Sequence, residues 1–244
     1  VLGPDIPMVA VFDTSFHQTM PEKAYMYAIP HEYYEKYHIR KYGFHGTSHR
    51  YVSSHFLQIT GRDPKGTKIV VCHLGNGSSI TAVKDGKCVD TTMGFTPLAG
   101  LMMGTRSGSI DPSVVTYLMK KENLSPDEMS NILNKKSGFL GVSGLSSDSR
   151  DLVDASHEGN ERAILTCDMF RYQIMKTIGA YADAMGGLDA VLLTGGIGEN
   201  SDELRVDICE GMEFLGIELD PAKNIQHVRE DLRISKDGCR TEVW

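Results

Sequence analysis

Apolar residues recur at spacings of three and four through residues 161–185. This period is typical of a helix that buries one face. We predict a helix over residues 161–185, and we expect its apolar stripe to pack into the core rather than to bind a cofactor. The positions of the stripe are Ile164, Cys167, Phe170, Ile174, Ile178, Tyr181 and Met185.

Three short runs of β-forming residues follow one another closely in the first half of the chain. They cover residues 68–73, 79–84 and 87–91. The turns between them contain Asn76-Gly77 and Asp85-Gly86, which are strong hairpin signals, so we predict a three-stranded meander. A continuous apolar run at residues 190–193 is typical of a strand in a sheet that is covered on both faces.

Capping signals predict three further helices. Asp111 followed by Pro112 is typical of a helix start. A capping box at Ser125 and an N-cap at Ser201 mark two more starts, and we expect Gly138 to end the helix that begins after Ser125.

Both ends of the chain contain segments with strand character. Residues 7–12 are predicted to form a short buried strand, which would leave Asp13 at its carboxyl end. Residues 232–235 and 240–244 are predicted to form a closing hairpin. The resulting order of strands, helices, strand, helix and hairpin is that of an α/β fold.

Composition and charge argue against several classes of protein. A chain of 244 residues is long enough for one large domain or two small ones with their own core. The net charge of −7 argues against non-specific binding to nucleic acid or to an anionic membrane, because both require clustered basic residues. Five cysteines without a CxxC pair argue against a disulfide framework and a zinc site. Because no apolar run approaches the roughly 20 residues of a membrane span, we expect a cytoplasmic protein.

The ends of the sequence look cut. The chain begins at Val1 without an initiator Met and stops at Trp244, inside the predicted closing hairpin. We therefore expect it to be a piece of a longer protein, truncated at both ends.

A first glycine-rich segment, His73-Leu74-Gly75-Asn76-Gly77, joins two strands of the predicted meander. Its glycines would let backbone N–H groups face an anion such as a phosphate. The same Asn-Gly pair is also an ordinary hairpin turn, so both interpretations stay open.

A second glycine-rich segment, residues 194–200, leads from a strand into a helix. The start of a helix offers unpaired N–H groups and a partial positive charge, which favour phosphate. The segment matches neither GxGxxG nor the Walker A pattern, and a plain helix-entry turn is the alternative. Two such segments in one fold favour a nucleotide site more than either does alone.

Arg106 lies between two glycines, just before a predicted helix. A guanidinium in such a loop can reach phosphate oxygens, although a surface turn is the alternative. His45 and His49 stand at the end of a long irregular loop over residues 14–46 and near a short helix expected over residues 48–56. We expect these histidines to bind no metal, because a third ligand and a carboxylate at ligand spacing are missing.

Five motifs closely resemble the acetate kinase family and occur in the family's order. They lie at residues 12–21, 42–49, 73–77, 103–112 and 194–200. The family belongs to the actin, heat-shock-chaperone and sugar-kinase superfamily, whose members have two domains of ribonuclease-H-like fold around an ATP cleft. The resemblance implies that residues 1–15 end one domain and that residues 16–244 form the C-terminal nucleotide-binding domain.

The resemblance also implies roles for individual residues. Arg106 and His45 would stabilise the transferring phosphoryl group, and Asp13 would lie at the reaction centre, as an organiser of Mg²⁺ or as a general base. Phe44 and Pro97 would line a pocket for the substrate methyl group. The residues implied at ATP are His73, Leu74, Gly75, Asn76 and Gly77 at the phosphates, Asp148, Ser149 and Arg150 beside the nucleotide, and Gly196, Ile197, Gly198, Glu199 and Asn200 at the adenosine.

The implied reaction transfers the γ-phosphoryl group of ATP to acetate, with Mg²⁺, in a homodimer. No residue of this chain is assigned as a metal ligand, because the family's metal-binding residues match nothing in it. We expect the isolated chain to bind nucleotide weakly and to turn over little. A propionate or butyrate kinase is the alternative within this class, and a non-catalytic ATP-binding or dimerisation module is the alternative outside it.

Overall fold

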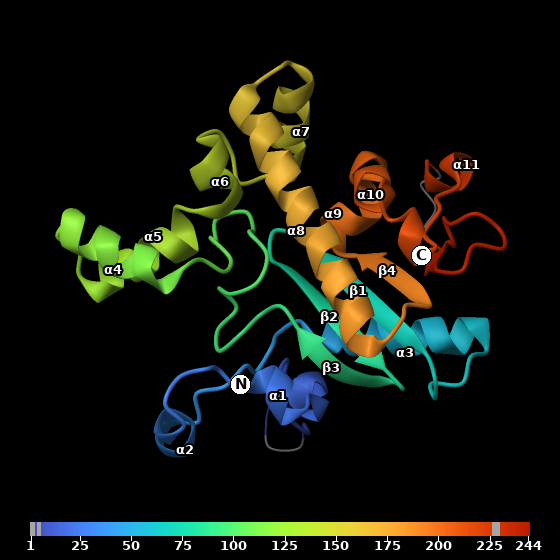
Figure 1. Ribbon diagram of the computed structural model, residues 1–244, viewed down its shortest axis with the longest axis horizontal. Helices are drawn as coiled ribbons and strands as arrows, with labels where there is room; N and C mark the ends of the chain where they lie inside the picture. Colours follow the sequence, from blue (N-terminus) through green and yellow to red (C-terminus); the bar gives the residue numbers. More distant parts are fainter. Residues whose placement is uncertain (1–2, 4–5, 226–229) are drawn as a thin grey trace.

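A mixed sheet lies at the centre of the structure, a computed structural model that describes residues 3, 6–225 and 230–244 (Figure 1). Its strand order within those residues is β3–β2–β1–β4–β5. The strands are β1 (Lys68–Leu74), β2 (Ser78–Lys84), β3 (Lys87–Thr91), β4 (Ala190–Thr194) and β5 (Glu242–Val243). The first three pair antiparallel, which confirms the predicted meander, whereas β4 runs parallel to β1 and β5 runs parallel to β4.

Side chains of β1 alternate between two helical layers. Val70 and Cys72 pack with the long helix α8 (Glu161–Met185), whereas Ile69 and Val71 pack with α3 (Gly46–Thr60). Figure 1 shows α8 crossing the face of the sheet nearest the viewer. Because helices cover both faces, these four side chains of β1 are fully buried. The predicted α/β class is confirmed, and the sheet is that of a ribonuclease-H-like domain.

Helix α8 has the predicted bounds, and most of its apolar stripe is buried. The Asn160 side chain caps its first turn, and Gly186, with a φ of 73°, ends it in the left-handed region. Ile174 is fully buried, in line with the prediction. Ile164 is 41% exposed, because the neighbouring Ala163 takes the buried position in the first turns.

Shorter helices surround these layers. They are η1 (Ser15–Thr19), α1 (Glu22–Tyr25), α2 (Glu32–Tyr37), α4 (Pro112–Lys121), α5 (Pro126–Lys135), α6 (Gly138–Ser143), α7 (Ser149–His157), α9 (Gly195–Asn200), α10 (Asp202–Cys209), η2 (Glu213–Leu215) and α11 (Pro221–Asn224). Asp111 caps α4, and Ser125 forms the predicted capping box of α5. These two helices extend away from the sheet as an arm (Figure 1). No helix in the described ranges is both long and apolar enough to cross a membrane.

Three predictions about helices need correction. The helix expected over residues 48–56 is α3, which is longer at both ends. The loop expected over residues 14–46 contains η1, α1 and α2. Gly138 begins α6 instead of ending α5, and its φ of 61° explains the glycine, since a Cβ there would also collide with the carbonyl oxygen of Met103.

Both terminal strand predictions are wrong in form. Residues 7–12 make no strand, and Met8 and Val9 are 94% and 84% exposed. No described strand pairs with this segment, and an apolar run without a pairing partner cannot form a buried ladder. At the other end, β5 joins the sheet parallel to β4, and Ser235 bridges to Leu219. The backbones of the two predicted hairpin segments meet only where the N–H groups of Ile234 and Ser235 donate to the Val243 carbonyl oxygen, so no regular hairpin forms.

Candidate active site

The two glycine-rich segments leave neighbouring strands at the same edge of the sheet. His73 of β1 pairs with Thr194 of β4 in a parallel register, so the residues after them emerge side by side. A Cβ on Gly75 would lie 4.0 Å from the backbone nitrogen of Gly196. Gly195 has a φ of 82°, and a Cβ there would lie 2.6 Å from the carbonyl oxygen of Leu74. Glycine is therefore required where the segments meet.

The second glycine segment was expected to lead into a helix, and it is itself helical. It winds into α9 directly after β4. The Glu199 carboxylate accepts hydrogen bonds from Thr194 Oγ1 at 2.9 Å and from the Gly195 backbone N–H at 3.1 Å. Asn200 Nδ2 donates to the Gly196 carbonyl at 2.8 Å. These local bonds fix the segment and leave Gly196 exposed beside the first segment.

Arg106 and His45 converge on the first glycine segment. A Cβ on Gly77 would lie 3.5 Å from both Arg106 Nη2 and His45 Nε2. Arg106 is held in this position because its Nη1 donates to the Pro97 carbonyl oxygen at 2.9 Å. Gly77 thus keeps open a small space that a guanidinium and an imidazole face, the arrangement that suits an anionic group.

Four histidines cluster behind this space. The rings of His45 and His73 lie 4.3 Å apart, and those of His49 and His17 lie 5.8 Å apart. Burial lowers the pKa of His45 to about 4, and the neighbouring His73 contributes in the same direction. Burial is also the main cause of the lowered pKa of His17, His49 and His73. The cluster is therefore uncharged near neutral pH.

Asp13 holds the beginning of α3 beside the cluster. Its Oδ2 accepts from the His45 backbone N–H at 2.6 Å, its Oδ1 from that of Thr47 at 3.4 Å, and its carbonyl oxygen from that of Gly46 at 2.9 Å. His45 itself has a left-handed φ of 56°. Asp13 thus satisfies helix N–H groups that have no partner within α3, and its exposed carboxylate stays next to the histidines.

Phe44 and Pro97 are the residues expected at a substrate methyl group. Phe44 directly precedes His45, and its carbonyl oxygen accepts from His17 Nε2 at 2.9 Å. Pro97 is exposed and is joined to Arg106 through its carbonyl oxygen.

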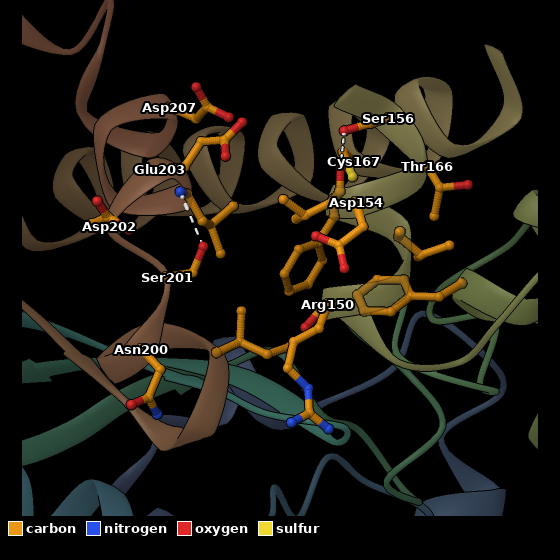
Figure 2. A pocket seen from close by; sticks show the side chains of 17 residues that line it. Arg150, Asp154, Ser156, Thr166, Cys167, Asn200, Ser201, Asp202, Glu203 and Asp207 are labelled. Carbon is orange, nitrogen blue, oxygen red and sulfur yellow. Dashed lines mark hydrogen bonds between the residues drawn. The ribbon is translucent and has the colours of Figure 1, made fainter. Parts of the chain in front are cut away.

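An open pocket lies between α7, α8 and α10 (Figure 2). Arg150 and Asn200 lie at one end of it, and Glu203 and Asp207 lie at the other. The predicted nucleotide residues that line it are Ser149, Arg150, Ile197 and Asn200. Phe139 and Phe170 also line it. Sequence reasoning missed both. Phe170 belongs to the apolar stripe of α8, which carries no sign of which members border a pocket, and Phe139 lies in α6, which was not predicted.

Asp148 lies next to this pocket rather than in its wall. Its side chain caps α7 and forms an ion pair with Arg150, with 2.6 Å between Arg150 Nη2 and Asp148 Oδ2. The hydrogen bonds from Arg150 hold the pKa of Asp148 at about 2. The predicted residues at positions 148–150 therefore divide between a helix cap and the pocket lining.

A family model described as the acetokinase family matches residues 2–244. The chain belongs to the acetokinase family. It is 59% identical over 244 residues to an acetate kinase of Clostridium botulinum strain Alaska E43, covering 100% of this chain and 61% of that protein. An acetate kinase of Thermoanaerobacterium thermosaccharolyticum is 63% identical over 222 residues, with 91% and 56% covered. The chain thus spans about three fifths of the length of the curated relatives it matches.

Two solved kinase structures have the same fold over the part that they share with this chain. A crystal structure of Porphyromonas gingivalis acetate kinase matches with a TM-score of 0.92 at 51% identity, covering 96% of this chain and 58% of that chain. A crystal structure of a propionate kinase from Francisella tularensis matches with a TM-score of 0.91 at 44% identity, covering 99% and 62%.

No group of three or more His, Cys, Asp or Glu residues within the described ranges could hold a metal ion. Asp13 and Glu199 each raise the pKa of His73 electrostatically, against the effect of burial, so both carboxylates act near the cluster. Mg²⁺ at a nucleotide usually needs only one or two protein carboxylates, together with phosphate oxygens and water. Asp13 fits that requirement, because the helix start uses only part of its acceptor capacity.

Proposed function

We propose that this chain carries the ATP site and part of the phosphoryl-transfer site of an acetate kinase. The reaction would transfer the γ-phosphoryl group of ATP to acetate and give acetyl phosphate and ADP, reversibly. Curated relatives named acetate kinase, which are 57–63% identical to the chain, support this choice of reaction. The observation that carries the proposal is the meeting of Gly77, His45 and Arg106 beside two glycine segments.

The proposal divides ATP between two parts of the chain. The phosphates would lie along Gly75, Asn76 and Gly77 at the edge of the sheet, close to Arg106. The adenosine would lie in the pocket of Figure 2, against Ile197 and the other predicted residues of α7 and α9. This division is supported by the position of α9, which lines the adenosine pocket and also borders the first glycine segment.

Charge neutralisation would be the main catalytic effect. Acetate is already ionised near neutral pH, so no proton has to be removed before it attacks. Two anions must instead approach each other, and fixed donors that face the phosphoryl oxygens lower that barrier. Arg106 supplies a permanent charge. His45, whose pKa is about 4, would supply a hydrogen bond rather than a second charge.

The proposal includes Mg²⁺, which would bind together with ATP. When bound, Mg²⁺ would neutralise part of the phosphate charge. Asp13 would hold it or its waters, since this carboxylate is exposed beside His45. An organising role fits Asp13 better than that of a general base, because the attacking carboxylate carries no proton.

For the acid that accepts the phosphoryl group, propionate is an alternative to acetate. The match to a propionate kinase structure is nearly as good as the match to an acetate kinase structure. One methylene changes binding by only about 1–3 kcal/mol, so Phe44 and Pro97 would set the preference through pocket volume. Rates of the enzyme on acetate, propionate and butyrate would decide, and a clear preference for propionate would overturn the choice of acetate.

The domain division, assembly and location are also proposed. Residues 16–244 would form the nucleotide-binding domain, since packing against the sheet begins at η1 while residues 7–12 are exposed. A homodimer would cover apolar side chains such as Val114 and Tyr117, which are exposed on α4. A cytoplasmic location would supply ATP and keep the five cysteines as the free thiols they are here.

The test is a calorimetric titration of the chain with Mg-ATP and, separately, with AMP. Arg106→Ala should weaken ATP binding by about 10-fold or more and leave AMP binding unchanged, because AMP has no β- or γ-phosphate. Arg150→Ala should weaken both, because Arg150 lines the adenosine pocket. Lys120→Ala, which removes an exposed charge on α4, should weaken neither.

Two results would refute the proposed site. One is a chain that binds neither nucleotide, and the other is Arg106→Ala with unchanged ATP affinity. Because the chain spans 61% of a relative's length, we expect binding without substantial turnover. A robust yield of acetyl phosphate from the chain alone would contradict that expectation.

A further inference from the structure

One buried hydroxyl joins two histidines of the cluster. Ser79 Oγ, on β2, lies 2.9 Å from His45 Nδ1 and 2.7 Å from His49 Nε2. Ser79 and His49 are both fully buried, so water does not compete for these bonds. A hydroxyl has one hydrogen and two acceptor lone pairs. The two rings are the only hydrogen-bond partners of Ser79 Oγ among the described residues, so its buried hydrogen is paired only if it donates to one ring, and the other ring then donates to it.

The other ring nitrogen of His49, Nδ1, determines which atom donates in each of these two hydrogen bonds. Its Nδ1 is buried and has no hydrogen-bond partner among the described residues. A neutral imidazole carries one proton, either on Nδ1 or on Nε2. If Nε2 accepted from Ser79, Nδ1 would be an unpaired N–H in the core. If Nε2 donates to Ser79, only a lone pair of Nδ1 is left unpaired, and the N–H is satisfied.

Two observations favour the second arrangement. A buried donor without an acceptor costs about 1–3 kcal/mol, and unpaired buried N–H groups are rarer than under-used acceptors. Burial also lowers the pKa of His49 well below its ordinary value, so the ring is neutral and carries a proton on only one of its two nitrogens. His49 Nε2 therefore donates to Ser79, and the Ser79 hydroxyl donates to His45 Nδ1.

This direction fixes the proton of His45. Since Nδ1 accepts, the proton of the neutral ring lies on Nε2, the atom that faces the space at Gly77 beside Arg106. We propose that Ser79 and His49 are positioning residues that hold His45 as its Nε2–H tautomer, with the donor aimed at the phosphoryl group. The phosphoryl target rests on the proposed function, whereas the tautomer does not.

The opposite tautomer would present a lone pair to the phosphoryl oxygens. Two acceptors would then face each other at the point where negative charge is transferred, and the interaction would be repulsive. Holding the proton on Nε2 makes the same ring a hydrogen-bond donor without adding charge. The geometry thus gives Ser79 and His49 an effect on the reaction although neither faces the space at Gly77.

Nitrogen-15 NMR of histidine-labelled chain tests the tautomer directly, because ring nitrogens with and without a proton have widely separated shifts. The signals of His45 are identified by their loss in His45→Gln. At pH 7.5 without ligand, we expect a protonated Nε2 and an unprotonated Nδ1 for His45. A protonated Nδ1, or protons on both nitrogens, would overturn the proposal.

Three variants test the two positioning residues. Ser79→Ala removes the donor to Nδ1, and His49→Phe removes the proton that sets the direction, so each should convert the single His45 tautomer into a mixture. His49→Gln keeps an N–H donor near the place of Nε2 and should preserve the single tautomer. If either Ser79→Ala or His49→Phe keeps the wild-type His45 spectrum, that residue has no positioning role.

A separate measurement distinguishes failure of this inference from failure of the proposed function. The indole signal of Trp244 reports whether each variant is folded, and if His49→Phe does not fold, Ser79→Ala against His49→Gln decides. Titration with Mg-ATP is then made on the wild type. An Nε2–H tautomer without ATP binding would refute the proposed function alone, and ATP binding with an Nδ1–H tautomer would refute the inference alone.

Discussion

Single glycines around the candidate site have different reasons to be glycine. At Gly77 a Cβ would meet only ordinary contacts, 3.5 Å from Arg106 and His45. At Gly104 a Cβ would collide with the Asn76 side chain and lie 2.9 Å from the Ser147 carbonyl oxygen. The first glycine leaves room for a ligand, whereas the second leaves room for the chain itself.

We therefore predict opposite results for two alanine substitutions. Gly77→Ala should change the free energy of unfolding by no more than about 0.5 kcal/mol and should weaken Mg-ATP binding, because the methyl group occupies the phosphate space. Gly104→Ala should destabilise the fold by about 1–3 kcal/mol, because backbone has to move. Urea unfolding and ATP titration of both variants provide the comparison. Full ATP affinity in a stable Gly77→Ala chain would contradict this interpretation.

At the scale of elements, local signals in the sequence predicted most of the fold. The bounds of α8, the capping box of α5 and the three-stranded meander all depend on residues close together in the chain. The predictions that failed concern strands, whose pairing depends on residues far away in the sequence. Residues 7–12 have strand composition but no described strand beside them. β5 forms its ladder with β4, and only the Val243 carbonyl oxygen joins it to residues 234–235 of the predicted hairpin.

The candidate site was predictable as separate motifs and not as an arrangement. Motif resemblance singled out Arg106, His45 and both glycine segments, but not their arrangement. The pairing of β1 with β4 brings the two glycine segments to one edge of the sheet, and separate contacts place Arg106 and His45 beside Gly77. The short helix α9 was missed because glycines disfavour helix, and the bonds of Glu199 that favour it here are specific to this segment. Ser79 gave one signal, a polar residue inside a buried strand, which did not reveal its partners.

Helix α8 supplies most of one layer of the core, which makes its stability contribution testable. Ile174→Ala should lower the free energy of unfolding by about 2–5 kcal/mol, since Ile174 is fully buried between the helix and the sheet. Leu165→Ala is the matched control on the same helix, because Leu165 is 51% exposed, and it should change stability by no more than about 0.5 kcal/mol. Chemical unfolding of both variants measures the difference. Equal losses would mean that the stripe is not the buried face.

For the whole molecule, the four clustered histidines, of which His17 and His49 are buried and His45 and His73 half-buried, make stability depend on pH. Each has a folded pKa below its ordinary value of 6.5, and that of His45 is about 4. The unfolded chain therefore binds more protons than the folded chain between about pH 4 and 6.5, and stability is lost as pH falls through this window. Each histidine contributes a slope of up to about 1.4 kcal/mol per pH unit.

Urea unfolding at a series of pH values checks this prediction. We expect the free energy of unfolding to fall steadily from pH 6.5 to pH 5, and these histidines to add no slope between pH 7 and 8. A flat profile between pH 5 and 6.5 would show that the cluster is already protonated in the folded chain.

Ligand binding should also be visible in the stability of the whole chain. A nucleotide that binds only the folded state at 100 times its Kd raises the free energy of unfolding by about 2.7 kcal/mol. We expect Mg-ADP to raise the midpoint of thermal unfolding, and a smaller rise in Arg150→Ala at the same ADP concentration. An identical shift in both proteins would argue against the pocket of Figure 2 as the adenosine site.

Asp13 has a consequence for how this region can evolve. The same carboxylate anchors the entrance of α3 and sets the charge next to His45. A neutral Asn could keep the anchor and lose the charge, whereas Glu could keep the charge and misplace the anchor. Few single substitutions of Asp13 are therefore expected to persist in descendants of this sequence, because one residue determines both the start of the helix and the charge beside the histidines.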